Sequence, residues 1–183
     1  MFVITGPSGV GKGTLIRSLR ERVPGLELAI SATTREPRPG ERDGVDYHFL
    51  GDDEFARRVD AGEFVEHADY SGRRYGTLRS ELERGLASGD AVVLEIEVQG
   101  ARQVRQAIPD AVAVFIAPPD DAALRERLTA RGTDSERQIE RRLQTAREEL
   151  AAKDEFRHVI VNDDLDRAGD ELAALVDGTL RDR

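Results

Sequence analysis

The stretch Gly6-Pro7-Ser8-Gly9-Val10-Gly11-Lys12-Gly13-Thr14 decides how the rest of this sequence is interpreted. It follows a β-branched and aromatic run, residues 2–5, which predicts a buried strand. It precedes apolar residues at helical spacing, which predict a helix that ends near Arg22. A glycine-rich turn between a strand and a helix is typical of a phosphate-binding loop, because backbone N–H groups and the helix N-terminus converge on an anion. We therefore expect residues 6–14 to hold nucleotide phosphates, with Lys12 reaching the outer ones.

The loop departs from the usual phosphate-loop pattern at one position. The pattern places Ser or Thr directly after the lysine, whereas residue 13 is glycine and the hydroxyl follows at Thr14. A side-chain magnesium ligand at position 13 is therefore excluded. Either Thr14 contributes to phosphate binding, or the metal is held largely through water and nucleotide oxygens, which Mg²⁺ tolerates.

Length and composition favour a single globular protein with room for a small inserted lobe. The chain has 183 residues, of which 39% are hydrophobic and 34% are charged. No apolar run reaches the ~20 residues that span a bilayer and no signal peptide is recognised, so we expect a cytoplasmic protein without a membrane partner. The net charge of −9 argues against a nucleic-acid partner. Cysteine is absent, and the three histidines lack metal-ligand spacing, so we interpret them as ordinary polar residues.

The order of predicted elements indicates fold class α/β, with a P-loop NTPase-type parallel sheet and helices on both faces. A strand is predicted over residues 26–30. Residues 31–88 then lose the βα alternation and read as a small inserted α/β lobe, with short apolar pieces and two short helices. Alternation resumes at residue 90. The two short helices of the lobe are predicted over 52–60 and 78–86. After residue 90, strands are predicted over 91–98, 111–117 and 159–161. Helices are predicted there over 99–107 and from residues 120, 135 and 164.

Two arginines in the lobe are candidates for binding a phosphate. Arg35 and Arg38 lie three residues apart in the segment 31–41, which contains two prolines, and two guanidinium groups held in this way grip one phosphate from two sides. Tyr47 and Tyr75 supply hydroxyl donors in the same lobe. A solvated, proline-rich connector is the alternative for this segment.

Two acidic residues lie near the end of the predicted strand over 91–98. Strand periodicity places Glu95 and Glu97 on one face, about 7 Å apart. A carboxylate at the end of a parallel strand that faces a phosphate loop suits a contact with Mg²⁺. For Glu95 we predict a contact through water; the alternative is an acid that pairs with an arginine or is solvated.

An arginine-rich segment follows residue 130. Gly132 offers a hinge between two predicted helices, and a mobile flap of this kind brings guanidinium groups onto a transferring phosphoryl group. We expect Arg131 and Arg142 to have this role. The remaining arginines of the segment are expected to stay on the surface: Arg137, Arg141 and Arg147.

Together these motifs resemble the guanylate kinases, a family of nucleoside monophosphate kinases. The matching segments follow the family order and cover nearly the whole chain. They are Gly6–Thr14, Ser31–Glu41, Asp46-Tyr47, Tyr75-Gly76-Thr77, Glu95–Gly100, Ile116–Pro119, Arg131-Gly132-Thr133 and Val161–Leu165.

The resemblance implies transfer of the γ-phosphoryl group of ATP to GMP with Mg²⁺, giving ADP and GDP, with dGMP as a further acceptor. It implies a P-loop core over 1–31 and 89–183, a GMP-binding lobe over 32–88 and a helical lid over about 131–146. By resemblance, the GMP phosphate is held by Arg35, Arg38, Tyr47 and Tyr75. The guanine is read by Ser31, Glu66 and Thr77, with Glu41 and Glu95 also in the GMP site. Lys12 and the loop amides of Gly6, Pro7, Ser8, Gly9, Val10, Gly11, Gly13 and Thr14 hold the ATP phosphates, and Asn162 lies near the adenine. The catalytic set is Lys12, Arg35, Arg131 and Arg142.

The chemistry of guanine agrees with this implication. Guanine presents N1–H and a 2-amino group side by side, which one carboxylate, that of Glu66, accepts together, whereas adenine lacks the pair. The acceptor phosphate is already anionic, so catalysis needs alignment and charge stabilisation rather than a general base. One alternative is a guanylate-kinase-like scaffold module that binds peptides without catalysis; the intact Gly11 and Lys12 argue against it. Another is a related kinase with a different acceptor. Monomer and homo-oligomer are equally open.

Overall fold

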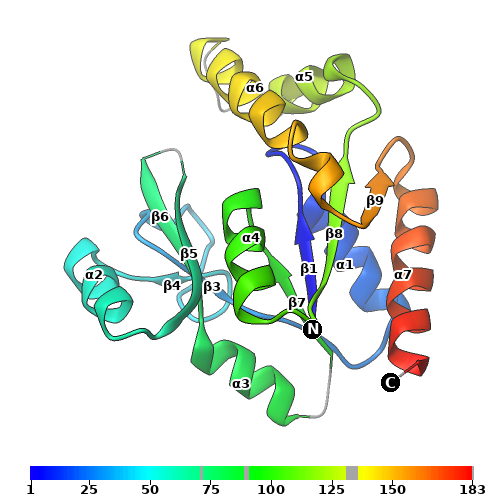
Figure 1. The fold of residues 1–183 in the computed structure, drawn as a ribbon. Helices are drawn as coiled ribbons and strands as arrows, with labels where there is room; N and C mark the ends of the chain where they lie inside the picture. Colours follow the sequence, from blue (N-terminus) through cyan, green and yellow to red (C-terminus); the bar gives the residue numbers. More distant parts are fainter. Residues whose placement is uncertain (71, 89–90, 131–135, 183) are drawn as a thin grey trace. The chain divides into compact units, whose positions relative to one another are not determined.

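The computed structural model describes residues 1–70, 72–88, 91–130 and 136–182 (Figure 1). The chain divides into two compact units. The first contains residues 1–3 and 26–112, and the second contains residues 4–25 and 113–183. Strand β1 (Phe2–Thr5) begins in the first unit and continues into the second.

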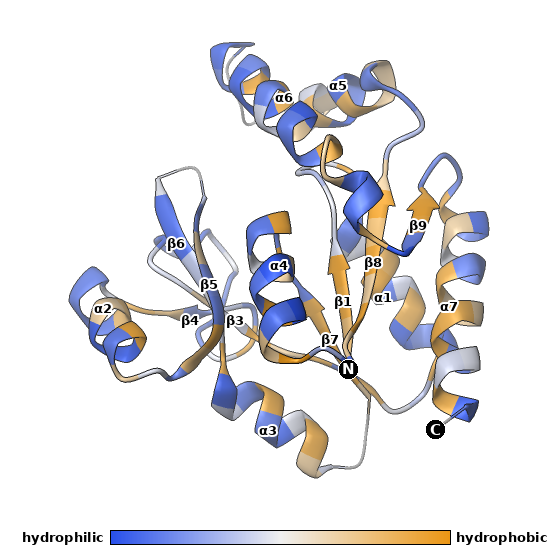
Figure 2. Cartoon of the chain, in the orientation of Figure 1, coloured by the Kyte–Doolittle hydropathy of each residue, from blue (hydrophilic) through white to orange (hydrophobic). Residues whose placement is uncertain are grey.

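The central sheet has the strand order β2-β7-β1-β8-β9. In the first unit, β2 (Leu26–Leu28) runs parallel to β7 (Ala91–Glu95). In the second, which β8 (Val112–Ala117) enters after its first residue, β8 runs parallel to β9 (His158–Val161), with Ile116 opposite Ile160. All four residues of β1 are buried, as are the last four of β8, and Figure 2 colours both strands as mainly hydrophobic. The parallel pairing of β2 with β7 and of β8 with β9 confirms the predicted parallel sheet. Strands of such a sheet are buried on both faces, which is why their sequences are continuous apolar runs.

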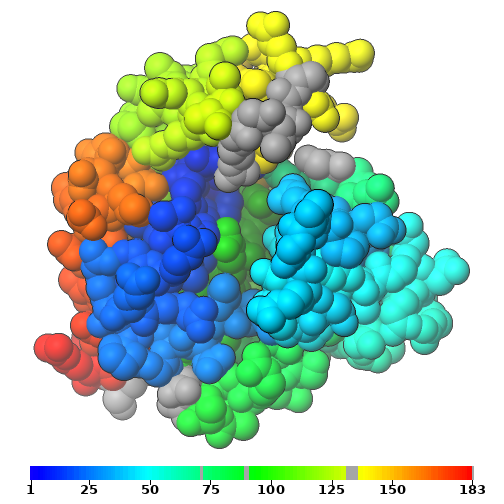
Figure 3. Space-filling model, turned by 180° about the vertical axis from the view of Figure 1, so that it is seen from behind, coloured from blue at the N-terminus to red at the C-terminus, as the bar shows by residue number. Residues whose placement is uncertain are grey.

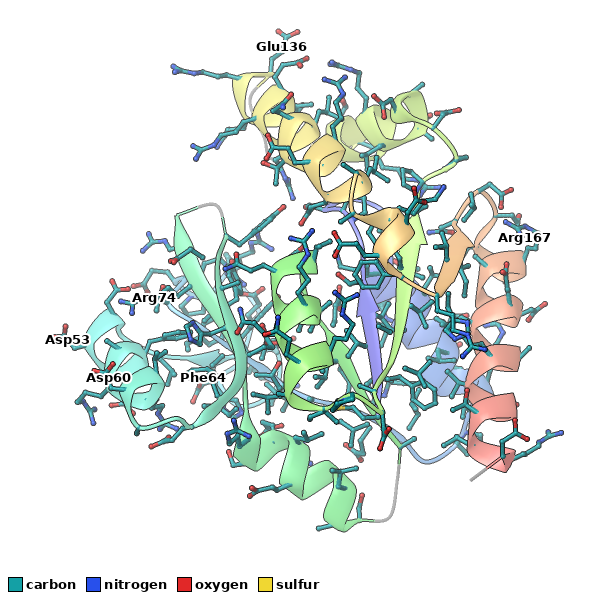
Figure 4. All side chains as sticks on the ribbon, viewed as in Figure 1. Asp53, Asp60, Phe64, Arg74, Glu136 and Arg167 are labelled. Atoms are coloured by element: carbon teal, nitrogen blue, oxygen red, sulfur yellow. The ribbon has the colours of Figure 1, made fainter. Side chains whose placement is uncertain are left out.

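The first unit also contains a second, four-stranded sheet with the order β4-β3-β6-β5. Its strands are β3 (Ser31–Thr33), β4 (His48–Phe49), β5 (Phe64–Tyr70) and β6 (Arg73–Leu78). Helix α2 (Asp52–Asp60), which has the predicted bounds, packs on β5. The core between them contains Phe55 and Phe64, whose stacked rings have centroids 4.5 Å apart. Phe64 and Arg74 are labelled on this sheet in Figure 4, and the Arg74 guanidinium lies 5.3 Å from the ring centroid of Phe55.

Two more helices complete the first unit. They are α3 (Arg79–Ala87), which packs on β7, and α4 (Val98–Ala107), which packs on β5. Two predicted strands of this unit differ from the observed ones. The strand predicted over 26–30 ends at Leu28, and the chain enters the second sheet at Ser31. The strand predicted over 91–98 ends at Glu95, because Glu97 is the N-cap residue of α4 and Val98 is its first helical residue.

In the second unit, helix α1 (Lys12–Arg22) packs against α7 (Leu165–Arg181). The side chain of Asp164 caps α7 by accepting a hydrogen bond from the Arg167 backbone N–H, as the sequence predicts for this helix start. Helices α5 (Asp121–Ala130) and α6 (Glu136–Leu150) share an apolar cluster formed by Leu124, Leu128, Ile139, Leu143 and Ala146. A short 3₁₀ helix, η1, covers Lys153–Glu155. The helix start predicted at residue 135 lies outside the described residues. None of the helices in the described part of the chain is long and apolar enough to cross a membrane.

Candidate active site

The glycine-rich loop occupies the turn between β1 and α1, as predicted. Gly6 has a φ of 136° and Gly11 a φ of 97°, in the region that side chains rarely adopt. A Cβ atom on Gly6 would lie 2.2 Å from the Ile116 carbonyl oxygen, and one on Gly11 would lie 2.7 Å from Asn162 Nδ2. Glycine is therefore required at both positions, by backbone conformation and by close packing. Gly11 is also the N-cap of α1, so the free N–H groups of this helix begin at the loop.

Lys12 is the buried cation of the loop, with 7% of its surface exposed. Its Nζ atom donates hydrogen bonds to the carbonyl oxygens of Gly6 at 2.5 Å and Pro7 at 3.3 Å. A buried ammonium group needs such partners, and these two carbonyls hold it over the loop. By contrast, Gly13 and Thr14 are exposed at the start of α1.

Two side chains from elsewhere in the second unit donate hydrogen bonds that hold the loop in place. Asn162, which follows β9, donates from Nδ2 to the Val10 carbonyl at 2.8 Å. Arg127 of α5 donates to the same carbonyl at 3.2 Å and to the Asn162 carbonyl at 2.8 Å. The family resemblance predicts that Asn162 lies near the adenine, and Arg127 is not among the predicted site residues. Position in the sequence gives no signal for Arg127, because its partner Val10 lies 117 residues away.

Helix α6, most of which falls in the predicted lid, contributes one predicted site residue to the loop. Arg142 of α6 donates from Nη2 to the Ser8 hydroxyl at 2.9 Å. A guanidinium group at this point adds positive charge next to the backbone that is predicted to hold phosphates. Arg131, its predicted companion, lies outside the described residues.

The predicted guanine-reading residues meet on three neighbouring strands of the first unit. Ser31 of β3 lies opposite Thr77 of β6, and Thr77 lies opposite Glu66 of β5. Residues directly opposite one another in antiparallel strands point to the same face of the sheet. The Thr77 hydroxyl donates to Glu66 Oε1 at 2.8 Å. Three residues that are up to 46 positions apart in the numbering therefore form one polar row.

The carboxyl group of Glu66 is buried, with 4% of the residue exposed. Burial raises the pKa of Glu66 to about 7 from its ordinary value of 4.5, and hydrogen bonds from Thr77 offset only part of this effect. The negative charge of Glu97 raises the pKa further. Such an acid is poised near neutral pH, and a neighbouring pair of N–H donors would stabilise its ionised form.

The predicted phosphate arginine Arg35 is held by a carboxylate. Its Nη1 and Nη2 atoms each donate to Glu41 at 2.9 Å, and Nη1 also donates to the Glu36 carbonyl at 2.7 Å. The Arg35 guanidinium lies 5.2 Å from the centroid of the Tyr47 ring. Hydrogen bonding to Arg35 lowers the pKa of the Glu41 carboxyl, although burial opposes this shift. Glu41 therefore orients Arg35 directly, which the sequence alone did not indicate.

Three more residues of the lobe are predicted to hold the GMP phosphate, namely Tyr47, Tyr75 and Arg38. The rings of Tyr47 and Tyr75 lie edge to face, with centroids 6.2 Å apart. Burial raises the pKa of Tyr47, and the charge of Glu95 adds to this effect, so Glu95 lies within electrostatic reach of Tyr47. Arg38 is exposed, and its backbone N–H donates to Glu41 at 2.7 Å. The segment of residues 31–41, which contains Arg35 and Arg38, forms part of the surface drawn in Figure 3, where it is sky blue.

A metal site formed by protein side chains alone is absent from the part of the chain that the structure describes. No group of three or more His, Asp or Glu side chains could hold an ion there. Glu95 and Glu97, predicted as neighbours on one strand face, instead lie at the end of β7 and at the N-cap of α4.

Comparison with known proteins identifies the family. The guanylate kinase family model matches residues 1–179. A guanylate kinase of Frankia casuarinae is 56% identical over 179 residues, which cover 98% of this chain and 97% of the relative. One of Synechococcus sp. (strain JA-3-3Ab) is 53% identical, over 96% of this chain and 81% of the relative. A crystal structure of guanylate kinase from Anaplasma phagocytophilum has a TM-score of 0.80 and 31% identity, and the match covers 98% of this chain and 85% of that one. The resemblance and the α/β fold class that the sequence predicts are thereby confirmed, and the chain belongs to the guanylate kinase family of nucleoside monophosphate kinases.

Proposed function

We propose that this protein transfers the γ-phosphoryl group of ATP to GMP, and also to dGMP, with Mg²⁺ as the metal. The observation that carries the proposal is the row Ser31, Thr77 and Glu66, a buried carboxylate with a hydroxyl partner in the sheet of the lobe. One carboxylate that accepts both N1–H and the 2-amino group selects guanine, because AMP would leave the charge unpaired. The names of the relatives agree with this acceptor.

The proposal gives each unit one substrate. The loop of residues 6–14, with Lys12 and Arg142, binds the phosphates of ATP, and Asn162 holds the loop near the adenine. The lobe of residues 32–88 binds GMP, with its phosphate on Arg35, Arg38, Tyr47 and Tyr75. Arg131 and the lid of residues 131–146 complete the cover of the transferring group.

Chemistry in this arrangement is a direct displacement. An oxygen of the GMP phosphate attacks the γ-phosphorus of ATP, the bond to the β–γ bridging oxygen breaks, and ADP leaves with the electron pair. No proton has to be removed from the attacking oxygen, so no general base is assigned. Lys12, Arg35, Arg131 and Arg142 stabilise negative charge on the transferring group.

Mg²⁺ supplies neutralisation of the phosphate charge when it is bound. Hard oxygen donors fit this ion, and it keeps several waters in most protein sites. We assign Glu95 as the acceptor of a hydrogen bond from a metal-bound water. Nothing in the described residues favours the scaffold alternative, since the glycines and Lys12 of the loop are in place.

The test is an ADP-release assay with GMP, dGMP, AMP, UMP and CMP as acceptors. Turnover with GMP and dGMP and little with the other three would support the proposal, and equal turnover with AMP would overturn it. Lys12→Ala is expected to lower kcat by orders of magnitude. Lys153→Ala is the matched control, because Lys153 is the only other lysine of the chain and is exposed. Near-normal turnover of Lys12→Ala would contradict the catalytic assignment.

A further inference from the structure

Helix α4 approaches the Glu66 carboxyl group at a glycine. A Cβ atom on Gly100 would lie 2.3 Å from Glu66 Oε2 and 3.0 Å from Glu66 Cδ. Real Cβ atoms essentially never come within 3.0 Å of another heavy atom, so the position admits only glycine while Glu66 keeps its place. Gly100 is buried, and it lies in the first turn of α4, three residues after the N-cap residue Glu97.

Backbone conformation does not explain this glycine. Gly100 is within a regular helix, and glycine there costs roughly 0.5–1 kcal/mol relative to alanine. Contact with the carboxyl group does explain it, because removal of the Cβ lets the end of Glu66 lie against the helix. The N-terminal turn of a helix carries partial positive charge, which favours a carboxylate at this place.

A second contact docks the same helix on the same strand. Gln103 lies one turn after Gly100, on the same side of α4. Its Nε2 atom donates to the His67 carbonyl at 2.7 Å, and its Oε1 atom accepts from the His67 N–H at 3.1 Å. Strand β5 is the edge strand of its sheet, so the Gln103 amide occupies hydrogen-bonding groups of the residue next to Glu66. The helix thus holds β5 at two adjacent residues.

We propose that Gly100 and Gln103 are positioning residues for base selection, which set where the Glu66 carboxyl group stands and thereby the preference for guanine. This inference rests on the proposed function, since it assumes that Glu66 accepts the two N–H groups of guanine. Neither residue is among those assigned to the phosphates of the two substrates. Their substitution therefore weakens binding of GMP and leaves the binding of ATP unchanged.

The experiment measures dissociation constants by calorimetry for GMP and for IMP, which lacks the 2-amino group, together with the KM for ATP. Gly100→Ala displaces the carboxyl group, so we expect its affinity for GMP to fall roughly 10- to 100-fold, the size of a lost hydrogen bond to a charged group. The GMP over IMP preference falls with it, and the KM for ATP stays within about twofold. Gln103→Ala frees β5 without a clash and shifts the same ratio in the same direction by a smaller factor. It carries the test if Gly100→Ala does not fold.

Two other helical glycines supply matched controls. A Cβ on Gly178 of α7 meets nothing within 4 Å, so Gly178→Ala is expected to keep both the affinities and the stability. A Cβ on Gly85 of α3 would lie 2.6 Å from Val92 Cγ2, so Gly85→Ala crowds the core without reaching Glu66. We expect Gly85→Ala to lower the melting temperature and to keep the GMP over IMP ratio.

The outcomes separate this inference from the proposed function. A wild-type protein that fails to bind GMP removes the proposed function itself. A wild-type protein that binds GMP, with an unchanged GMP over IMP ratio in Gly100→Ala, overturns the role of Gly100. An equal change of the ratio in Gly85→Ala also overturns it, because general disturbance of packing would then suffice.

Discussion

Glu66 illustrates the conflict between stability and recognition at a single residue. Its carboxyl group is buried in the first unit, and burial raises its pKa to about 7. An isolated buried charge is costly, and hydrogen bonds from the hydroxyl and the backbone of Thr77 favour the ionised form of Glu66. Under the proposed function, base selection requires the ionised form, so the free protein would carry a cost that the binding of guanine relieves.

The first prediction concerns the stability of Glu66→Gln. The pKa of Glu66 in the folded protein lies above its ordinary value of 4.5, so its favourable contribution is full below pH 4.5 and is lost as pH rises through about 7. Glutamine does not ionise. We therefore expect Glu66→Gln to gain stability over wild type between pH 5 and pH 8, by up to about 3 kcal/mol. Denaturant unfolding at both pH values measures this. Glu83→Gln, at an exposed position, is the control, and a Glu66→Gln difference that does not vary with pH would count against the prediction.

The second prediction concerns the pH dependence of GMP binding. Below a pKa of about 7 the ionised fraction of Glu66 falls about tenfold per pH unit, and the affinity for GMP is expected to fall with it. Calorimetric titration between pH 5.5 and pH 8 gives the profile. The GMP phosphate titrates in the same range, so Glu66→Gln, which retains only that effect, is measured in parallel. Identical profiles for the two proteins would remove Glu66 from the base site.

At the scale of elements, the junction between β2 and β3 shows what residue patterns miss. The sequence predicts one strand over 26–30, because the whole segment is compatible with a strand. In the structure the Ile30 N–H donates to Glu81 Oε2 at 3.2 Å rather than to a neighbouring strand. Glu81 is buried on α3 and also contacts His48 Nε2 at 3.0 Å and Arg84 at 2.9 Å. The Ile30 N–H thus leaves the sheet for an acceptor 51 residues away, and no local sequence pattern predicts this contact.

Other elements could be predicted from local signals alone. The bounds of α2 follow from turn residues on both sides, and the start of α7 follows from the capping side chain of Asp164. The row Ser31, Thr77 and Glu66 was found through the family resemblance, and the strand register explains why the three meet. The roles of Arg127 and Gly100 could not be predicted in this way, because each depends on an approach between segments that only the folded chain brings together.

The third prediction tests the junction through Glu81. Burial alone would raise the pKa of Glu81, but hydrogen bonds from Arg84, His48 and the Ile30 N–H outweigh it and lower the pKa. Glu81→Ala leaves the Ile30 N–H without this acceptor, at a cost of about 1–3 kcal/mol in the free energy of unfolding at pH 7. Thermal or denaturant unfolding measures the loss. Glu83→Ala, on the exposed side of the same helix, is expected to change stability by less than about 0.5 kcal/mol. Equal losses in the two variants would show that Glu81 does not hold the junction.

At the scale of the whole molecule, the proposed substrates divide between the two units. The residues assigned to ATP phosphates belong to the unit of residues 4–25 and 113–183, and those assigned to GMP belong to the unit of residues 1–3 and 26–112. Direct displacement requires the reacting atoms to come within about 3–3.5 Å of each other. Exclusion of water from the transferring group adds the same requirement. Under the proposed division of the substrates, both units must therefore contribute to the reaction site when the nucleotides are bound.

The last prediction is that the protein becomes more compact when both nucleotides are bound. A compact chain of 183 residues has a radius of gyration of about 16 Å, so closure is measurable by X-ray scattering in solution. We expect the radius to decrease with GMP plus a non-hydrolysable ATP analogue, and to decrease less with either nucleotide alone. Glu66→Gln is the control, because its weaker hold on GMP requires more of that ligand for the same decrease. Scattering curves that stay identical in the free and fully bound protein would argue that the site is already assembled, and that closure is no part of the reaction.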